Sequence, residues 1–439
     1  MAVWGDILPP DGQAGLYPAG KGNVMTPYES RLKRLEDAVA LKEPDRVPIS
    51  PIGQCFPVYE AGYSMADVLY DFDKGAESFK NFYKKYEPDY AMGHEYINIG
   101  NGPIMELQQS KTMTWAGAPG TRIDKNSIHQ FIEFPVLVAD EFDLYNIDST
   151  GWMIEKGLPK VSGLLEPMSR WGLASGHLIA EAGMLAAAVS TPESRKMIET
   201  LWKINDLRTE LMQKMAKLND DIVEIGIPIV MKGGAGVPFD GYSNFYRGTL
   251  EAMVDMFERE DVIMRYKARA LPKTLEMIEM HAKVEGNAGK WVFMALHKGM
   301  DSFMSDAQYR KYYWDDLQAI IEKIISVGMV PYVYTEGPYT SRLDCLKDVT
   351  PGKAVYHFEQ CDMALAKKKL GGVACISGGF PVYLLHYGTK EEVVNEAKRL
   401  IDICAPGGGF IFETSCGFDN AKTENVEAMV DTVKNYGKR

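Results

Sequence analysis

The stretch Trp291-Val292-Phe293-Met294-Ala295-Leu296 is an unbroken apolar run. Such a run is typical of a β-strand that is buried on both faces, as the strands of parallel sheets are. Downstream, Leu317, Ile321 and Ile324 recur at the spacing of one helix face. The sequence therefore predicts a strand followed by an amphipathic helix.

The same alternation continues to the end of the chain. Further strands are predicted over 330–334, 354–357, 373–376 and 410–412, and further helices over 363–370, 391–403 and 425–433. Strands alternating with helices indicate parallel βαβ units, which form either an open doubly wound sheet or a closed barrel. No GxGxxG motif stands between a strand and a helix, so nothing favours a dinucleotide-binding sheet. We favour a (β/α)8 TIM barrel.

Outside this region the pattern is less regular. Residues 1–30 are rich in Gly and Pro and are interpreted as an N-terminal arm, which lies on the body of the protein or on a neighbouring subunit, and residues 31–439 as the barrel. Short alternating runs over about 100–165 predict a β-rich, antiparallel insertion. The remaining predicted elements are strands at 47–52 and 89–93, and helices at 64–86, 192–219 and 248–284, the last broken near Glu260 and Pro272.

Composition limits the classes of function. There are 60 acidic and 48 basic residues, and the formal net charge is −12. A broad basic surface for nucleic acid or anionic membrane is therefore disfavoured. No apolar run is long enough to cross a bilayer, and no secretory signal is visible. The six cysteines are irregularly spaced and form no CxxC pair, which indicates a reduced, cytoplasmic protein.

Chemistry-bearing residues follow the predicted strands, where a barrel gathers its catalytic groups. Glu336, His357 and Cys416 each follow a different strand. A carboxylate, an imidazole and a thiolate that leave a fourth position open form a donor set suited to catalytic zinc. The alternative for each residue is structural: a solvated Glu, a hydrogen-bonded His and a small buried Cys.

Two further pairs are candidates at the strand ends. His297 and Asp301 form either an acid–base pair or a histidine beside a helix-capping Asp. His94 and Glu95 form either a polar wall of the substrate site or a satisfied turn. We predict His297 and Asp301 as catalytic residues and His94 and Glu95 as substrate-binding residues.

From about Arg34 to Tyr436 the chain resembles the uroporphyrinogen decarboxylase superfamily, which includes the decarboxylase and corrinoid-dependent methyltransferases. The resemblance rests on short segments in a fixed order. They are Glu43-Pro44-Asp45-Arg46-Val47-Pro48, the span 241–261, the Lys-rich helix ending at Gly371-Gly372, Gly388-Thr389-Lys390-Glu391-Glu392-Val393, and Glu424-Asn425-Val426. Members of this superfamily are (β/α)8 barrels, so the resemblance implies the same fold.

Departures from the family patterns narrow the implied activity. True decarboxylases resembling this chain carry a motif whose arginines bind the propionates of the substrate. The matching residues of this chain, 51–57, contain no arginine. Thiol-activating methyltransferases carry His-x-Cys where Tyr334-Thr335-Glu336 stands. Glu336 and His357 are instead spaced as in part of a zinc motif of aryl methyl ether O-demethylase methyltransferases. The upstream Glu of that motif has no match in register, because Glu322 is one residue out.

The resemblance thus implies a zinc-dependent methyltransferase that moves a methyl group from a methoxylated aromatic to cob(I)alamin on a separate corrinoid protein. Zinc would bind Glu336, His357 and Cys416, and the partner would supply the cobalamin. Rival functions are a methylcorrinoid-to-acceptor methyltransferase, a lyase acting on a carboxylated substrate, and a non-catalytic barrel that only docks the corrinoid protein. A monomer and a homodimer both remain open.

Overall fold

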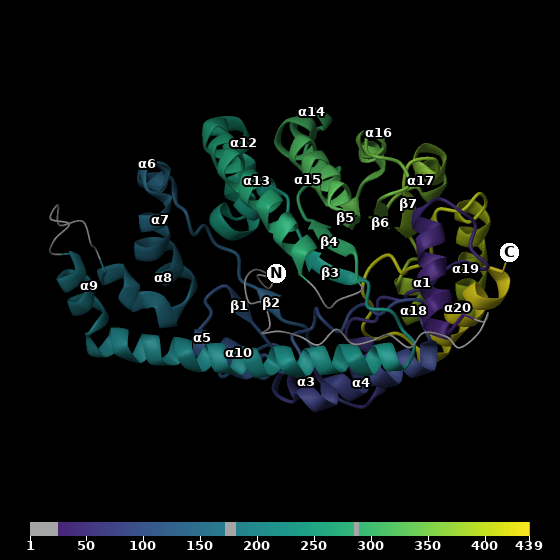
Figure 1. The fold of residues 1–439 in the computed structure, drawn as a ribbon, viewed down its shortest axis with the longest axis horizontal. Coiled ribbons are helices and arrows are strands. Elements are labelled where there is room, and N and C mark those ends of the chain that lie inside the picture. The colour runs from purple at the N-terminus through teal and green to yellow at the C-terminus, as the bar shows by residue number, and fades with distance from the viewer. Residues whose placement is uncertain (1–24, 172–180, 285–288, 439) are drawn as a thin grey trace.

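The computed structural model describes residues 25–171, 181–284 and 289–438. Figure 1 shows parallel strands with their covering helices on one side of the molecule. A single long helix, α10 (Pro192–Glu224), runs from beneath these strands to α9 (Glu181–Val189) at the far end. The molecule is therefore a barrel-like body with an elongated excursion.

Helix α1 (Pro27–Val39) opens the described part of the body. Thr26 caps it, because its side chain accepts a hydrogen bond from the Glu29 backbone N–H (3.2 Å) and the Glu29 carboxylate accepts one from Thr26 N–H (2.7 Å). Regular structure thus begins at Pro27 and not near residue 31. Most of the predicted 1–30 arm lies outside the described residues.

Six parallel strands form one sheet in chain order. They are β3 (Met231–Gly234), β4 (Trp291–Leu296), β5 (Val330–Pro338), β6 (Val355–Gln360), β7 (Cys375–Gly378) and β8 (Phe410–Ile411). The last five correspond to the predicted strands. Gly378 adopts a φ of 82°, and a Cβ there would meet the Phe358 carbonyl at 2.3 Å, so only glycine lets β7 pass this close to β6.

Two extended segments, 48–50 and 89–91, fill the gap between β8 and β3. A few backbone hydrogen bonds join them to their neighbours. Phe412 N donates to Pro48 O (2.8 Å) and Ser50 N to Phe412 O (3.1 Å), while Asp89 N donates to Ile49 O (2.7 Å) and Ala91 N to Pro228 O (2.9 Å). The prolines at 48 and 228 cannot donate to a ladder, so neither segment forms a regular strand. The sheet itself does not close, yet the eight segments follow one another as in a (β/α)8 barrel.

Strand side chains alternate between two hydrophobic clusters. One cluster fills the barrel interior and includes Trp291, Tyr332, Val355, Cys375 and Ile411. The other packs the outer strand faces, such as Val292 and Val333, against the helices. The described α-helices of the C-terminal half are α11 (Pro238–Gly241), α12 (Thr249–Glu258), α13 (Glu260–Lys283), α14 (Asp306–Gln308), α15 (Asp315–Ser326), α16 (Leu343–Leu346), α17 (Met363–Leu370), α18 (Tyr383–Tyr387), α19 (Lys390–Cys404) and α20 (Thr423–Tyr436).

The structure confirms most predicted helices and corrects two details. A break separates α12 from α13 at Arg259, as predicted, but α13 runs through Pro272 without a break. The insertion predicted as β-rich contains one antiparallel pair, β1 (Met113–Thr114) with β2 (Gln130–Phe131). Short helices form much of the rest of the insertion, including α5 (Gly102–Gln108), α6 (Phe142–Ile147), α7 (Ser149–Trp152) and α8 (Leu158–Val161). The helices before the insertion are α2 (Phe56–Glu60), α3 (Met65–Tyr70) and α4 (Phe72–Tyr86).

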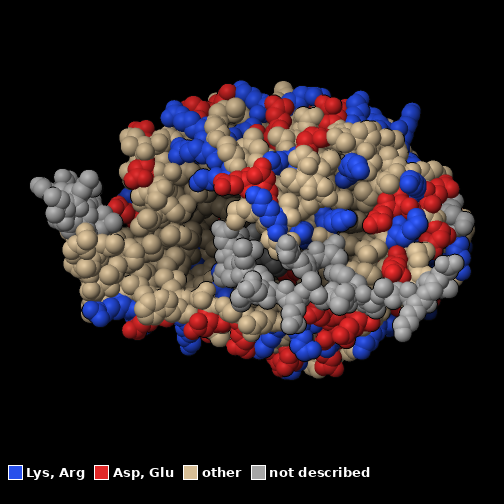
Figure 2. Space-filling view, viewed as in Figure 1, with Lys and Arg blue, Asp and Glu red and all other residues tan. Residues whose placement is uncertain are grey.

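The surface shown in Figure 2 intermingles acidic and basic side chains and carries no continuous basic tract among the described residues. The same view shows a hollow between the excursion and the barrel body. None of the described helices combines the length and apolar character needed to cross a membrane.

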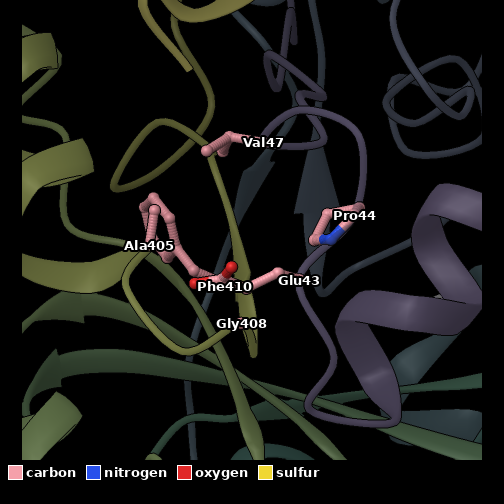
Figure 3. Close-up of a pocket in the computed structure, with 6 residues that line it drawn as sticks. All are labelled: Glu43, Pro44, Val47, Ala405, Gly408 and Phe410. Carbon is pink, nitrogen blue, oxygen red and sulfur yellow. The ribbon is translucent and has the colours of Figure 1, made fainter. Parts of the chain in front are cut away.

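A small cavity lies at the amino ends of the strands (Figure 3). Glu43, Pro44 and Val47 line it from the segment before the first extended piece, and Gly408 and Phe410 line it from the start of β8. Its volume of about 10 Å³ holds about one water molecule. Catalytic groups of such barrels stand at the opposite, carboxyl ends of the strands, so this cavity belongs to the stabilising face.

Candidate functional site

The carboxyl ends of β4 and β5 bring His297 and Glu336 together. The His297 Nδ1 lies 2.7 Å from the Glu336 carboxylate, and both side chains are partly exposed. Burial opposes protonation of the imidazole, but the hydrogen bond to Glu336 and the charge of Asp240 outweigh it and raise the pKa of His297. None of the described residues hydrogen-bonds its Nε2, so a protonated His297 has one N–H available to a ligand.

Asp240 fixes the loop that carries His297. Its carboxylate accepts the backbone N–H groups of His297 (3.0 Å) and Lys298 (2.9 Å) and the hydroxyl of Tyr313 (2.5 Å). Burial raises the pKa of the Asp240 carboxyl. Asp240 follows β3, and no recognisable sequence motif marks it.

Asp301 is not the partner of His297. Its carboxylate accepts the backbone N–H (3.0 Å) and the hydroxyl (2.8 Å) of Ser341, and it lies 3.5 Å from the Arg342 guanidinium. Asp301 follows His297 by four positions in the loop after β4, and its side chain contacts the helical turn that follows β5. The predicted His297–Asp301 pair is therefore replaced by the His297–Glu336 pair.

A second histidine–glutamate pair lies deeper in the barrel. The His357 Nδ1 is 2.8 Å from a Glu413 oxygen, and neither side chain is exposed to solvent. The hydroxyls of Tyr332 (2.8 Å) and Tyr90 donate to the same carboxyl group. The His357 Nε2 is 3.0 Å from the Ser415 carbonyl oxygen, which can only accept, so this nitrogen carries a hydrogen.

Burial controls the protonation of this inner pair. It lowers the pKa of His357 to about 4 and raises the pKa of Glu413 well above its ordinary value. Both shifts favour the neutral form of the pair, in which the Glu413 carboxyl holds the proton and donates it to Nδ1.

The Tyr334 ring lies beside His357, because the two residues are register partners on β5 and β6. It stacks on the His357 imidazole with ring centroids 4.3 Å apart and an interplanar angle of 7°. Burial raises the pKa of Tyr334, and the charges of Cys416, Glu359 and Glu336 act in the same direction. Burial also raises the pKa of the Cys416 thiol. Glu336 belongs to the partly exposed pair and His357 to the buried one.

This arrangement does not form the predicted zinc site. Glu336 is bound to His297, and the Ser415 carbonyl occupies the His357 Nε2. Among the residues that the structure describes, no group of three or more His, Cys, Asp or Glu side chains is placed to hold a metal ion. The three residues as arranged do not form a zinc site, and the zinc ligand set stays a prediction.

His94 and Glu95 differ in their exposure to the site. His94 is fully buried, with Nδ1 2.9 Å from the Tyr83 hydroxyl and Nε2 2.9 Å from the Asn219 amide oxygen. It joins α4 to α10, as the satisfied-turn alternative expects. Glu95 stays partly exposed, and one of its carboxylate oxygens is buried without a hydrogen-bond partner among the described residues.

Sequence profiles place the chain in a family. The profile described as Uroporphyrinogen decarboxylase (URO-D) matches residues 186–436, which is more than half of the 439 residues. The chain belongs to the uroporphyrinogen decarboxylase family. The match includes every strand of the six-stranded sheet and both histidine–glutamate pairs.

A solved structure supports the same fold for this URO-D family member. It is a methyltransferase from Methanosarcina mazei, with a TM-score of 0.55 and 14% sequence identity over 92% of this chain and 98% of that chain. At this identity the likeness shows the fold alone. No curated protein matches the sequence significantly.

Proposed function

We propose that this protein is a methyltransferase that moves a methyl group from a methoxylated aromatic compound to cob(I)alamin on a separate corrinoid protein. The observation that carries the proposal is the His297–Glu336 pair, in which the carboxylate raises the pKa of an imidazole at the carboxyl ends of the strands. The lack of the propionate-binding arginines and the fold shared with a methyltransferase also support it.

The reaction needs an acid more than it needs a nucleophile from this chain. Cob(I)alamin attacks the methyl carbon, the C–O bond breaks, and its electron pair stays on the aryl oxygen. The proton on His297 Nε2 passes to that oxygen, and Glu336 stabilises the imidazolium until the transfer. The products are a free phenol and methylcobalamin.

Aromatic side chains supply a surface for the donor's ring. Phe293, Tyr334 and Tyr96 are only partly buried, although they pack on the barrel-interior cluster. Their ring centroids are 5.1 Å apart for Tyr96 and Phe293 and 5.9 Å apart for Phe293 and Tyr334. A largely apolar wall with one acid at its edge suits a methoxyarene.

A direct assay tests the proposal. Guaiacol mixed with this protein and a reduced corrinoid carrier should give catechol and methylcobalamin. The change of the cobalt spectrum from Co(I) to methyl-Co(III) measures the reaction. If a panel of methoxyarenes gives no methylcobalamin while a carboxylated substrate loses CO2 without any corrinoid, the protein is a lyase, a function that its family membership also favours.

The zinc prediction has a separate test. Elemental analysis of an active preparation, together with Cys416→Ala, measures whether about one zinc per chain is bound through Glu336, His357 and Cys416. A metal-free, active preparation would remove zinc from the proposal and leave the acid mechanism intact.

A further inference from the structure

One buried arginine holds the loop that carries the candidate acid. We call residues 297–304, which follow β4, the acid loop. Arg342 lies in the helical turn after β5 and is 1% exposed. Its guanidinium donates to three backbone carbonyls of the acid loop, those of Gly299 (3.1 Å), Met300 (3.3 Å) and Met304. A single side chain after β5 thus fixes the path of the loop after β4.

Asp301 adds bonds in the opposite direction, from the acid loop to the end of β5. Its backbone N–H donates to the Pro338 carbonyl (2.7 Å). Its carboxylate accepts the backbone N–H (3.0 Å) and the hydroxyl (2.8 Å) of Ser341 and lies 3.5 Å from the Arg342 Nε. Pro338 follows Glu336 by two positions, so these bonds join the acid loop to the strand end that carries its carboxylate partner.

Close packing fixes the acid loop between these bonds and its first residue. A Cβ at Gly299 would meet the Tyr313 ring at 2.8 Å, so the loop lies against this ring as closely as glycine allows. The Tyr313 hydroxyl donates to Asp240, which accepts the backbone N–H of His297 (3.0 Å). The acid loop is therefore held by Asp240 at its start and by Arg342 along the rest of its length.

The chemistry of the guanidinium explains what Arg342 contributes. Its charge is balanced by the Asp306 carboxylate, and its central carbon lies 4.5 Å from the centroid of the Tyr309 ring. A buried ion pair is weak evidence for stability, because desolvation offsets much of its attraction. What the guanidinium supplies is a rigid, planar fork of N–H donors, which can bind several carbonyls at fixed angles. The contacts of Arg342 therefore determine geometry.

We propose that Arg342 is a positioning residue that acts through the acid loop and holds the His297 imidazole against Glu336. A catalytic group that is misplaced by about 1 Å can lose about a hundredfold in rate, so the path of this loop matters for the reaction. The catalytic consequence rests on the proposed function, in which His297 is the proton donor. The positioning itself can be measured without turnover.

The kinetic test uses Arg342→Lys, which keeps the positive charge but replaces the fork with one ammonium group. With guaiacol and a reduced corrinoid carrier, kcat should fall roughly tenfold or more, whereas the KM for guaiacol should change less than about threefold. The KM is spared because the aromatic residues proposed to bind the ring lie outside the acid loop. In a His297→Ala background, Arg342→Lys should cause no further loss of kcat, because both changes remove the same contribution.

A spectroscopic test measures the position of the imidazole directly. The Cε1–H resonance of His297 reports its contact with Glu336 (2.7 Å), and His297→Ala identifies it among the resonances of the seven histidines. In Arg342→Lys this resonance should move toward the position of a solvent-exposed histidine. If it moves while the wild type methylates no acceptor, the positioning role stands and the proposed function fails.

Arg34→Lys is the matched control. Arg34 is also buried and also binds two carboxylates, those of Asp45 (2.7 Å) and Asp89 (2.6 Å), but it lies on α1. It should therefore lose stability as Arg342→Lys does, yet keep the wild-type kcat and the wild-type His297 resonance. The inference is overturned if Arg342→Lys leaves that resonance in place, if it lowers kcat equally with and without His297, or if Arg34→Lys shifts the resonance as much.

Discussion

The two histidine–glutamate pairs of this barrel differ in protonation although their geometry is nearly the same. The nitrogen–oxygen distance is 2.7 Å for His297–Glu336 and 2.8 Å for His357–Glu413. Water reaches the outer pair and not the inner one. The partners of the outer imidazole raise its pKa and favour its protonated form, whereas burial raises the pKa of the inner carboxyl group and favours the proton there. Burial, and not the identity of the partners, decides whether such a pair is an acid or a neutral structural bond.

The largest expected difference between the pairs is in stability. Glu413→Ala removes the hydrogen-bond partner of His357 and of the Tyr90 and Tyr332 hydroxyls, and should lower the free energy of unfolding by about 3–5 kcal/mol. Glu336→Ala at the exposed pair should cost no more than about 1 kcal/mol. Urea denaturation of both variants measures the difference, and equal losses would contradict the assignment of inner and outer pairs.

The second difference is in the pH dependence of stability. Between about pH 4.5 and 6.5 the unfolded chain binds one proton at these two residues, on His357. The folded pair also binds one proton, on Glu413. The inner pair therefore does not change the free energy of unfolding with pH in this range. In Glu413→Gln the folded state keeps His357 unprotonated down to about pH 4, so stability falls with pH through this window by about 3 kcal/mol relative to wild type.

The unfolding free energy of the variant falls as pH decreases because its unfolded state binds more protons than its folded state between pH 6.5 and 4. Thermal or urea unfolding at several pH values gives both curves. Parallel curves for wild type and Glu413→Gln would mean that His357 is protonated in the folded variant, which would contradict the lowering of its pKa by burial.

The third difference is in turnover. His297→Ala should lower kcat for methyl transfer roughly a hundredfold or more, because the leaving aryl oxygen loses its proton donor. Its unfolding free energy should stay within about 1 kcal/mol of wild type, since the side chain is partly exposed. Wild-type rates in steady-state assays of this variant would remove His297 from the mechanism.

The smallest expected effect is a shift of the pH–rate profile. Activity should fall as pH rises through the raised pKa of His297, because only the protonated imidazole donates. Glu336→Gln removes the charge that favours the proton, so the alkaline limb should move to lower pH by about one unit. An alkaline limb that stays in place would show that another group is the acid.

Much of the fold was predictable because its signals are local. The apolar run at 291–296 and the helical spacing after it required nothing from distant residues, and β4 and α15 match them. Strands were predicted at 47–52 and 89–93, but these segments form only a few backbone hydrogen bonds. Prolines remove donors there, and the hydrophobic pattern does not register that loss.

The site was predictable in part. Reading strand ends identified His297, Glu336 and His357, but spacing alone could not show that the first two pair with each other. That pairing depends on β4 and β5 being neighbours with Leu296 opposite Thr335, a register that only the fold sets. Glu413 follows β8 and was visible at a strand end, yet its complete burial has no signal in the sequence.

The stacking of Tyr334 on His357 also keeps a titratable group silent. Tyr334 is the register partner of His357 on the neighbouring strand, and its ring lies parallel to the imidazole with the ring centroids 4.3 Å apart. A smaller residue at position 334 would uncover one face of the imidazole and reduce the burial that lowers the pKa of His357. Its loss would therefore turn a structural histidine into a second proton donor.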